Sequence, residues 1–227
     1  MDLKKHYNNL YLESIKKIKR DAYEIDHQID SLSDNRLGIT VVIRPSSAIK
    51  NKIQAFLDEI KKIDSEQYFY PDSDIHITVL SIISCYKGFD VKTISVPDYI
   101  AVIEKSLLEL HDLEINFQGV TASGSAVMIQ GFMNNNSLND FRNSLRNNFA
   151  NSGLESSIDK RYSIATAHST VVRFRKEISD KEKLIEILEK YRNYDFGTFH
   201  VKTVNLVCND WYQRKEFVQE LHEFTLK

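Results

Sequence analysis

Apolar residues recur along the chain with two alternating spacings. Short β-branched runs such as LGITVVI are typical of strands, whereas apolar positions three and four residues apart indicate helices with one buried face. The order strand, helix, strand, helix, strand predicts one structural unit over residues 37–120. Its expected elements lie at 37–43, 47–63, 76–83, 100–110 and 113–120.

The same order of elements recurs over residues 125–208, with elements expected at 125–132, 138–149, 168–174, 184–191 and 199–208. No linker rich in Pro, Gly or Ser divides the two units, so we expect a single domain, 37–227, with two related halves. Residues 1–36 form a predicted N-terminal helical extension. The apolar spacing of Phe217, Val218, Leu221 and Phe224 predicts a closing helix at about 213–225.

Each unit carries the same short motif on its second strand: His76-Ile77-Thr78-Val79 in the first and His168-Ser169-Thr170-Val171 in the second. Residues i and i+2 of a strand share a face, so each motif directs an imidazole and a hydroxyl to one side. Two such pairs facing one cleft suit phosphodiester chemistry. One histidine takes a proton, the other gives one, and the hydroxyls bind phosphoryl oxygens.

This arrangement resembles the 2H phosphoesterase superfamily, which includes 2′-5′ RNA ligase-like proteins and cyclic nucleotide phosphodiesterases. His76 to Val79 match the superfamily motif at every place, and only Ser169 departs from it in the second motif, at a position expected to face away from the cleft. The resemblance implies a bilobal α+β fold of two antiparallel sheets, related by a pseudo-twofold axis. Helices would cover their outer faces, and a cleft would lie between them.

Several further residues are candidates for substrate binding. Arg173 stands where ligase-like members often carry an arginine, and a guanidinium holds phosphate by paired hydrogen bonds. Arg44 and Arg161 are weaker candidates for the same role. Tyr70 and Tyr162 each precede a motif histidine by the same number of residues, so we expect them to offer two stacking platforms for bases. Trp211, in a polar run, is a third candidate for stacking.

Composition restricts the partners. The net charge of −2 and pI of about 6.4 argue against a protein that coats long nucleic acid, and favour a small cyclic or short oligonucleotide substrate. No apolar run approaches membrane-spanning length, so we expect a cytoplasmic protein with no membrane contact. We also expect the protein to be a monomer. Cys85 and Cys208 lack metal-like spacing, and no ligand cluster or nucleotide fingerprint appears, so no metal or cofactor is expected.

The sequence therefore predicts a metal-independent phosphodiesterase acting on a cyclic or short 2′-5′ or 3′-5′ linked nucleotide by two-histidine acid/base catalysis. Two alternatives stay open: a non-catalytic nucleotide sensor, and a sugar mutarotase that would not need paired phosphate-binding hydroxyls. The motifs do not decide which histidine is the acid and which the base. They also do not separate hydrolysis from ligation, which is the reverse of the same transesterification.

Overall fold

A computed structural model describes residues 2–108, 110–160 and 163–226 of the chain. Helices and strands alternate much as the apolar spacing predicts. In chain order they are α1 (Leu3–Lys19), β1 (Arg36–Ile43), α2 (Ser47–Ile63), β2 (Tyr68–Phe69), β3 (Ile77–Lys87), a 3₁₀ turn (Val91–Thr93), α3 (Val96–Leu107), β4 (Glu114–Ala122), β5 (Ala126–Met133), α4 (Ser137–Ala150), β6 (Ser169–Arg173), α5 (Lys181–Lys190), β7 (Asp195–His200), β8 (Thr203–Asp210) and β9 (Gln219–Thr225).

The strands form two antiparallel sheets, as the α+β prediction requires. One has the order β3-β1-β8-β9 and the other β2-β6-β5-β4-β7. The first two long strands of the first unit, β1 and β3, lie in one sheet with β8, the last strand of the second unit. In the other sheet β5 and β6 of the second unit lie with β4, the last strand of the first unit. The repeat units therefore exchange their last strands, and each sheet is built from both halves of the chain.

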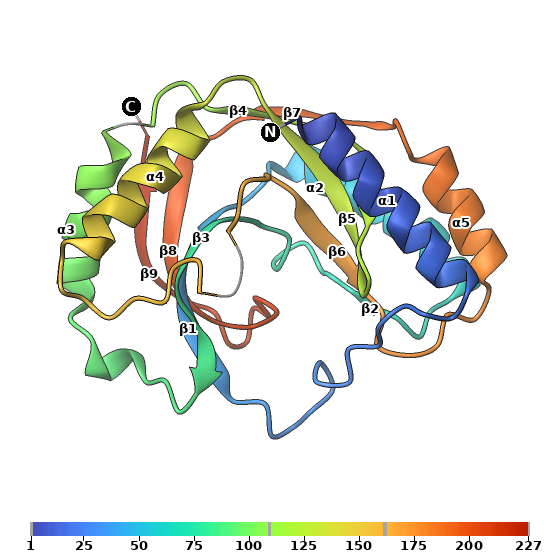
Figure 1. The fold of residues 1–227 in the computed structure, drawn as a ribbon, viewed down its shortest axis with the longest axis horizontal. Helices are drawn as coiled ribbons and strands as arrows, with labels where there is room; N and C mark the ends of the chain where they lie inside the picture. Colours follow the sequence, from blue (N-terminus) through green and yellow to red (C-terminus); the bar gives the residue numbers. More distant parts are fainter. Residues whose placement is uncertain (1, 109, 161–162, 227) are drawn as a thin grey trace.

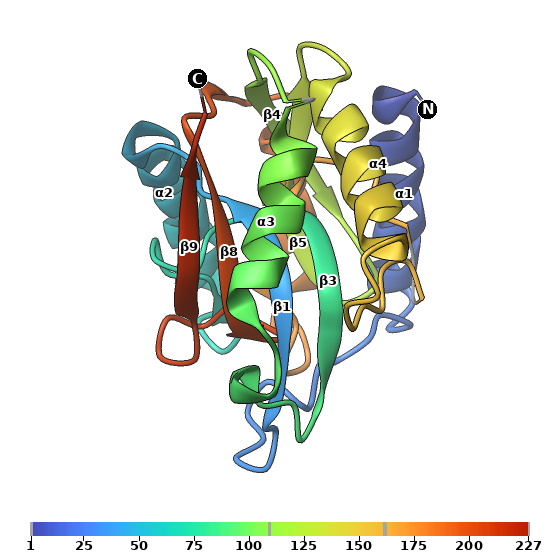
Figure 2. The same cartoon turned by 90° about the vertical axis from the view of Figure 1, so that its left-hand side faces the viewer.

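Helices cover the outer face of each sheet (Figure 1). Helices α3 and α4 contact each other and pack on the first sheet, whereas α1 and α2 pack on the second and α5 packs against both of them. Figure 2 shows α3 in front of β8, β9 and β1. Each helix buries an apolar stripe, such as Ile49, Ile53, Phe56 and Ile60 of α2. Because the helices bury the outer faces, the inner faces of the two sheets are left to carry the polar side chains of the cleft.

Two elements differ from the sequence-based prediction. The single strand expected at 199–208 is two strands, because the chain leaves the second sheet after His200 and enters the first at Thr203. The closing helix expected at 213–225 is wrong, since β9 is a strand paired with β8. Val207 faces Glu220 while Leu206 faces His222, so Leu221 is an extra residue in the ladder. Such a bulge breaks the period of two and leaves a helix-like apolar spacing.

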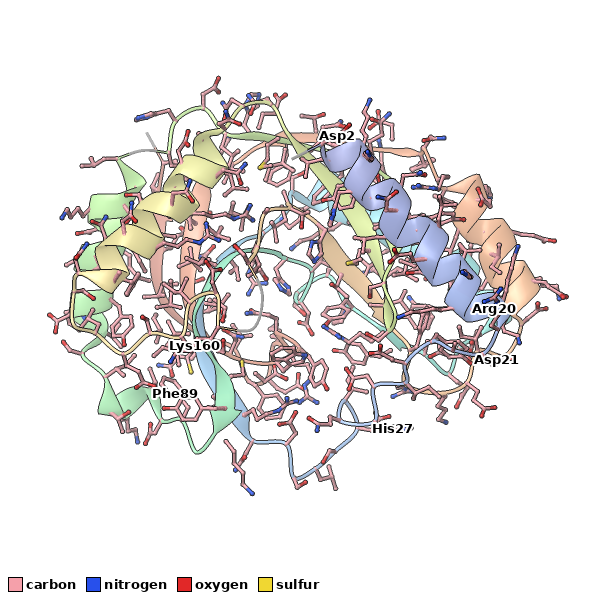
Figure 3. All side chains as sticks on the ribbon, in the orientation of Figure 1. Asp2, Arg20, Asp21, His27, Phe89 and Lys160 are labelled. Carbon is pink, nitrogen blue, oxygen red and sulfur yellow. The ribbon has the colours of Figure 1, made fainter. Side chains whose placement is uncertain are left out.

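Helix α1 covers only Leu3–Lys19 of the N-terminal extension, and it crosses the outside of the second sheet. Figure 3 shows α1 between Asp2 and Arg20, with Asp21 and His27 on the segment that continues toward β1. Tyr7, Tyr11, Ile15 and Ile18 of α1 are buried, and the helix packs on β4. Within the described parts of the chain, no helix combines the length and apolar character needed to cross a bilayer.

Candidate active site

A cleft of about 440 Å³ lies between the two sheets, and it is lined by the histidine and the threonine of both sequence motifs. Strands of both sheets contribute to its walls, among them β1 and β3 of the first sheet and β5 and β6 of the second. The lining residues are Thr40, Tyr70, His76, Thr78, Ser81, Cys85, Ser123, Ser125, Ala126, Met128, His168, Thr170, Arg173, Asn209, Trp211 and Gln213.

Strand alternation places the four motif residues on the cleft side. In β3, Thr78 is partly exposed while its neighbours Ile77 and Val79 are fully buried. In β6, Thr170 is likewise partly exposed between the buried Ser169 and Val171. His76 and His168 each stand one residue before the strand and two before the threonine. The period of two therefore brings an imidazole and a hydroxyl from each sheet into one cavity, as the sequence predicts.

The departure from the motif at Ser169 faces the core, as expected, and it leaves a polar atom without a partner. Ser169 is fully buried, and its hydroxyl finds no hydrogen-bond partner among the described residues. An apolar side chain would meet no such cost at this position. The serine therefore affects packing behind the motif and not the chemistry of the cleft.

Each motif histidine is anchored through its Nδ1 atom. Nδ1 of His76 lies 2.7 Å from the carbonyl oxygen of Asp74. A carbonyl only accepts, so this Nδ1 carries the hydrogen and Nε2 of the neutral ring holds the lone pair. Nδ1 of His168 lies 2.7 Å from the hydroxyl of Thr166, which can donate or accept, so this contact orients the ring without assigning its tautomer.

Both imidazoles are neutral in the unliganded protein near pH 7. Burial lowers the pKa of His76 to about 4, and the charges of Arg44 and Arg173 act in the same direction. Burial also lowers the pKa of His168 to about 4, with contributions from Arg142 and Arg173. Neutral imidazoles are ready to accept a proton, and the surrounding cations favour an anionic ligand in the cleft.

Arg142 of α4 connects the backbones of the two motifs. Its side chain is fully buried, and Nε donates to the carbonyl of Val79 over 2.8 Å. Nη2 donates to the carbonyl of Thr78 over 3.1 Å and to that of Thr166 over 2.8 Å. Burial lowers the pKa of Arg142 to about 10, so the guanidinium remains charged near neutral pH. One side chain thus sets the spacing between β3 and the segment that leads to His168.

Helix α1 and β5 support the second motif from behind. The Tyr7 hydroxyl donates to the carbonyl of Gly131 over 3.2 Å, and the Thr166 side chain is a further hydrogen-bonding neighbour of this hydroxyl. A Cβ added to Gly131 would lie 2.0 Å from the carbonyl oxygen of Ala167. Only glycine therefore allows the segment before His168 to pass this close to β5.

Arg173 lies in the cleft wall at the end of β6, held by three residues far away in the sequence. Its Nε donates to the Tyr70 hydroxyl over 3.0 Å, and Nη1 lies 3.6 Å from Oδ2 of Asp26. The Tyr212 hydroxyl donates to Oδ1 of Asp26 over 2.8 Å, and the guanidinium lies 5.3 Å from the centre of the Tyr212 ring. Burial opposes the charge, but Tyr70 and Asp26 outweigh it and raise the pKa of Arg173. A charged, oriented guanidinium therefore faces the cavity.

The other predicted binding residues differ in whether they line the cleft. The Tyr70 side chain is only 1% exposed, so its ring offers no open face for a base, and its hydroxyl positions Arg173 instead. This corrects the stacking role expected for Tyr70. Arg44 is not among the cleft-lining residues, because its Nη1 donates to the carbonyl of Ser73 over 2.8 Å. Trp211 lines the cleft and is partly exposed, with the Arg36 guanidinium 5.5 Å from its ring centre. Arg161 and Tyr162 lie outside the described residues.

Sequence reasoning missed several residues that line or support the cleft. Asp26 belongs to the polar stretch before β1, yet the backbone N–H of Asp26 donates to the carbonyl of Phe174 and its carboxylate reaches Arg173. Asn209 and Gln213 line the cleft from a run that its polarity marks as exposed. For Arg142 the sequence does contain an indication, because this residue interrupts the apolar face of α4 between Leu138 and Leu145. A charged residue on such a face must find buried partners.

Two antiparallel sheets around a cleft, to which each contributes a histidine and a threonine, form the arrangement expected for a 2H phosphoesterase. The family model for the AKAP7 2'5' RNA ligase-like domain matches residues 39–219, and the chain belongs to this family. A search of curated protein sequences found no match.

Solved structures share the fold at low sequence identity. E. coli LigT complexed with 3'-AMP is 12% identical, with a TM-score of 0.59 over 85% of this chain and 99% of LigT. TT0787 of Thermus thermophilus is 14% identical, with a TM-score of 0.57 over 84% of this chain and 97% of that one. ATU0111 from Agrobacterium tumefaciens, 17% identical, has a TM-score of 0.52 over 93% of this chain and 97% of its own. These likenesses show the fold alone.

Proposed function

We propose that the chain is a metal-independent phosphodiesterase that cleaves a cyclic or short 2′-5′ or 3′-5′ linked nucleotide. The observation that carries the proposal is the pair of anchored, neutral histidines, His76 and His168, in one cavity with two threonine hydroxyls. Acid/base catalysis of phosphodiester cleavage needs one group that accepts a proton and one that donates it. The family assignment supports a phosphodiesterase-type reaction.

In the proposed reaction one imidazole takes a proton from the attacking water, whose oxygen forms a bond to phosphorus. The bond to the leaving ester oxygen breaks, and the second imidazole protonates that oxygen. Because both histidines are neutral in the unliganded protein, the acid must gain its proton as substrate binds. The negative charge of the phosphodiester raises the pKa of a nearby imidazole and so supplies this condition. The roles of His76 and His168 depend on how the substrate lies.

Thr78, Thr170 and Arg173 meet the charge of the phosphoryl group. The two hydroxyls come from opposite sheets, and each is placed by strand alternation beside its own histidine. The Arg173 guanidinium lies in the same wall, fixed by Tyr70 and Asp26. Donors that are oriented before the reaction stabilise developing negative charge most effectively, since they need not reorganise.

The proposal that the mechanism needs no metal is based on the side chains available around the cleft. Among the described residues, no three His, Cys, Asp or Glu side chains are grouped to hold a metal ion. The cleft instead presents hydroxyls and a guanidinium to the phosphate. Activity should therefore persist in EDTA, and loss in EDTA with rescue by Mg²⁺, Mn²⁺ or Zn²⁺ would overturn this part of the proposal.

The substrate class follows from size and charge. A cavity of about 440 Å³ has the size of a site for a nucleotide, and the net charge of −2 disfavours long RNA. LigT has been solved with 3'-AMP, ATP, NADP+ and phosphate, which shows small nucleotides and phosphate bound to a protein of the same fold. A monomeric state and a cytoplasmic location stay predictions from the sequence.

The experiment that tests the proposal is incubation with a panel of candidate substrates, followed by mass identification of the products. The panel comprises cyclic mononucleotides, cyclic di- and trinucleotides, 2′-5′ oligoadenylate and RNA with a 2′,3′-cyclic end. Cleavage of one class, abolished in His168→Ala, supports the phosphodiesterase. Tight binding without turnover would favour a sensor, and joined products would favour ligation. Interconversion of sugar anomers, with no reaction on nucleotides, would favour a mutarotase.

A further inference from the structure

Helix α1 precedes the part of the chain that the family model matches, yet it is fixed to the sheet that carries the second motif. The match covers residues 39–219, whereas α1 covers Leu3–Lys19. The Thr121 hydroxyl donates to the carbonyl of Tyr7 over 3.0 Å, and the Ser14 hydroxyl donates to the carbonyl of Ala122 over 2.8 Å. These four residues are buried, so the helix is held at a defined position on β4.

Tyr7 of this helix contacts the segment that leads to His168. The Tyr7 side chain is 1% exposed, and its hydroxyl lies 3.2 Å from the carbonyl oxygen of Gly131 and 3.4 Å from the nitrogen of the same residue. Gly131 itself lies directly beside the backbone of Ala167. The Thr166 side chain hydrogen-bonds the same Tyr7 hydroxyl. A side chain of α1 therefore reaches the residue that contacts the catalytic imidazole.

The direction of the bond between Thr166 and His168 decides where the imidazole carries its hydrogen. Oγ1 of Thr166 lies 2.7 Å from Nδ1 of His168, and the Thr166 carbonyl accepts from Arg142 over 2.8 Å. Burial and the charges of Arg142 and Arg173 keep His168 neutral. A neutral imidazole has one N–H, so Nδ1 either donates to the hydroxyl or accepts from it.

The hydrogens of the three groups can be assigned in turn. A carbonyl only accepts, so the Tyr7 hydroxyl gives its hydrogen to Gly131. The Tyr7 oxygen then has no second hydrogen to give, and the Thr166 hydroxyl must be the donor to it. With its only hydrogen given to Tyr7, Oγ1 of Thr166 accepts from His168. Nδ1 of His168 is therefore the N–H, and Nε2 holds the lone pair.

We propose that Tyr7 is a positioning residue that acts through Thr166 and fixes His168 in the tautomer with its hydrogen on Nδ1, so that Nε2 is the proton acceptor offered to substrate. The inference deepens the proposed function and rests on it for the use of His168 in catalysis. His76 has the same tautomer, set by the carbonyl of Asp74. A carbonyl cannot reverse its hydrogen bond, whereas a hydroxyl can, and this difference explains why the second histidine needs a further residue.

This tautomer serves either role that His168 takes in the reaction. A base needs the lone pair on Nε2. An acid is an imidazolium with a hydrogen on both nitrogens, so its Nδ1 also donates. Thr166 must accept in both states. A Thr166 hydroxyl without Tyr7 would be free to turn and donate to Nδ1, and would then stabilise the neutral ring with its hydrogen on Nε2, where no proton can be accepted.

The test reads the tautomer directly in the unliganded full chain, labelled with ¹⁵N at histidine. Long-range proton–nitrogen NMR spectra separate a ring nitrogen that carries hydrogen from one with a lone pair. Near pH 7 we expect Nδ1–H for His168 and for His76. In Tyr7→Phe the Nε2 resonance of His168 should shift toward that of an N–H, and that of His76 should not move. A hydrogen on Nε2 of His168 in the unaltered chain, or an unchanged tautomer in Tyr7→Phe, would overturn the inference.

Tyr11→Phe is the matched control. Tyr11 lies one turn along the same helix and is also buried, but its hydroxyl lies near Glu189 of α5 and not near the second motif. The His168 spectrum should be unchanged in this variant. Thr166→Val should shift the Nε2 resonance as Tyr7→Phe does, and Thr166→Ser should restore it, because serine keeps the hydroxyl. This pair decides the question if Tyr7→Phe fails to fold, since equal spectra for Val and Ser would also overturn the inference.

Kinetics then separate the two proposals. On a confirmed substrate, Tyr7→Phe should lower kcat by roughly three- to tenfold, the worth of one hydrogen bond, and leave KM unchanged because the phosphate contacts remain. A changed tautomer with unaltered kcat would overturn the positioning role. A changed tautomer in a chain that cleaves no nucleotide would remove the phosphodiesterase and keep the tautomer assignment. Turnover with an unchanged tautomer would do the reverse.

Discussion

The Nε atom of Arg173 donates to the hydroxyl of Tyr70 over 3.0 Å, although the two residues come from different halves of the chain. Tyr70 follows β2, which pairs with β6 through Tyr68 and Phe69, and the N–H of Tyr70 donates to the carbonyl of Val171. The approach to the first motif is therefore an edge of the sheet that holds the second. A tyrosine near His76 orients the arginine near His168.

Tyr70→Phe tests this positioning role. The ring and its packing stay, but the bond to a charged group is lost, at a cost of about 1.5–3 kcal/mol. We expect kcat/KM to fall about tenfold or more, with most of the effect in KM, because a freer guanidinium binds the phosphate less well. Tyr68→Phe is the control, since no hydrogen bond of the Tyr68 hydroxyl is found among the described residues. Similar losses in both variants would contradict the positioning role.

The histidines carry the next prediction. His76→Ala and His168→Ala should each lower kcat by about 10²–10⁴-fold on a confirmed substrate, because each removes one proton transfer of the same displacement. The double variant should be little worse than either single one. His200→Ala is the control, because its imidazole is exposed and lies by Glu114 at the surface. Near-normal turnover in His168→Ala would mean that the two-histidine mechanism is wrong.

The threonines separate hydrogen bonding from packing. Thr78→Val and Thr170→Val keep the shape and remove the hydroxyl, so each should cost about 2–4 kcal/mol of transition-state stabilisation, as for other oxyanion donors. Thr→Ser at the same positions keeps the donor and should be mild. Steady-state kinetics on the four variants decide the question: equal losses for Val and Ser would show that the methyl group, and therefore packing, is what matters.

Burial of the two neutral histidines makes a prediction about pH. Their pKa values are lowered to about 4 in the folded protein, whereas an unfolded histidine titrates near 6.5. Between these values the unfolded chain binds more protons, so the free energy of unfolding should fall as the pH falls from about 6.5 to 4. Urea unfolding at several pH values measures the slope. His76→Asn with His168→Asn should flatten it.

The same pKa values are visible by NMR. The imidazole resonances of His76 and His168 should titrate below pH 5 in the unliganded protein. Bound 3′-AMP should move at least one of the two midpoints upward, because the phosphate charge favours the imidazolium. Midpoints near 6.5 without ligand would mean that the cleft is wetter than its burial indicates.

The catalytic pairs could be predicted from sequence because a strand has a period of two and the motif repeats at equivalent places in each unit. The exchange of β4 and β8 between the sheets could not, since local spacing does not say which strands pair. The same limit hid Asp26, whose role depends on where the N-terminal segment crosses β6. Polarity was misleading for Asn209 and Gln213, because a binding cleft buries polar side chains that an ordinary loop would expose.

Arg142 offers the last test, because it joins the two motif segments without reaching the chemistry itself. Arg142→Lys keeps the charge but replaces two separate donor atoms, Nε and Nη2, by a single ammonium, which does not match the positions of the carbonyls of Thr78, Val79 and Thr166. We expect the free energy of unfolding to fall by about 3 kcal/mol, since buried carbonyls lose their donors and a buried charge loses its partners.

Arg146→Lys, one turn along α4, is the matched control. Arg146 is partly exposed and pairs with Asp159 over 2.6 Å, so its replacement should cost at most about 1 kcal/mol. Urea unfolding measures both variants, and turnover at a temperature where both are folded separates stability from geometry. Because Arg142 sets the spacing between Thr78 and Thr166, its variant should also lose kcat while folded. Full activity in folded Arg142→Lys would show that the two strands keep their spacing without it.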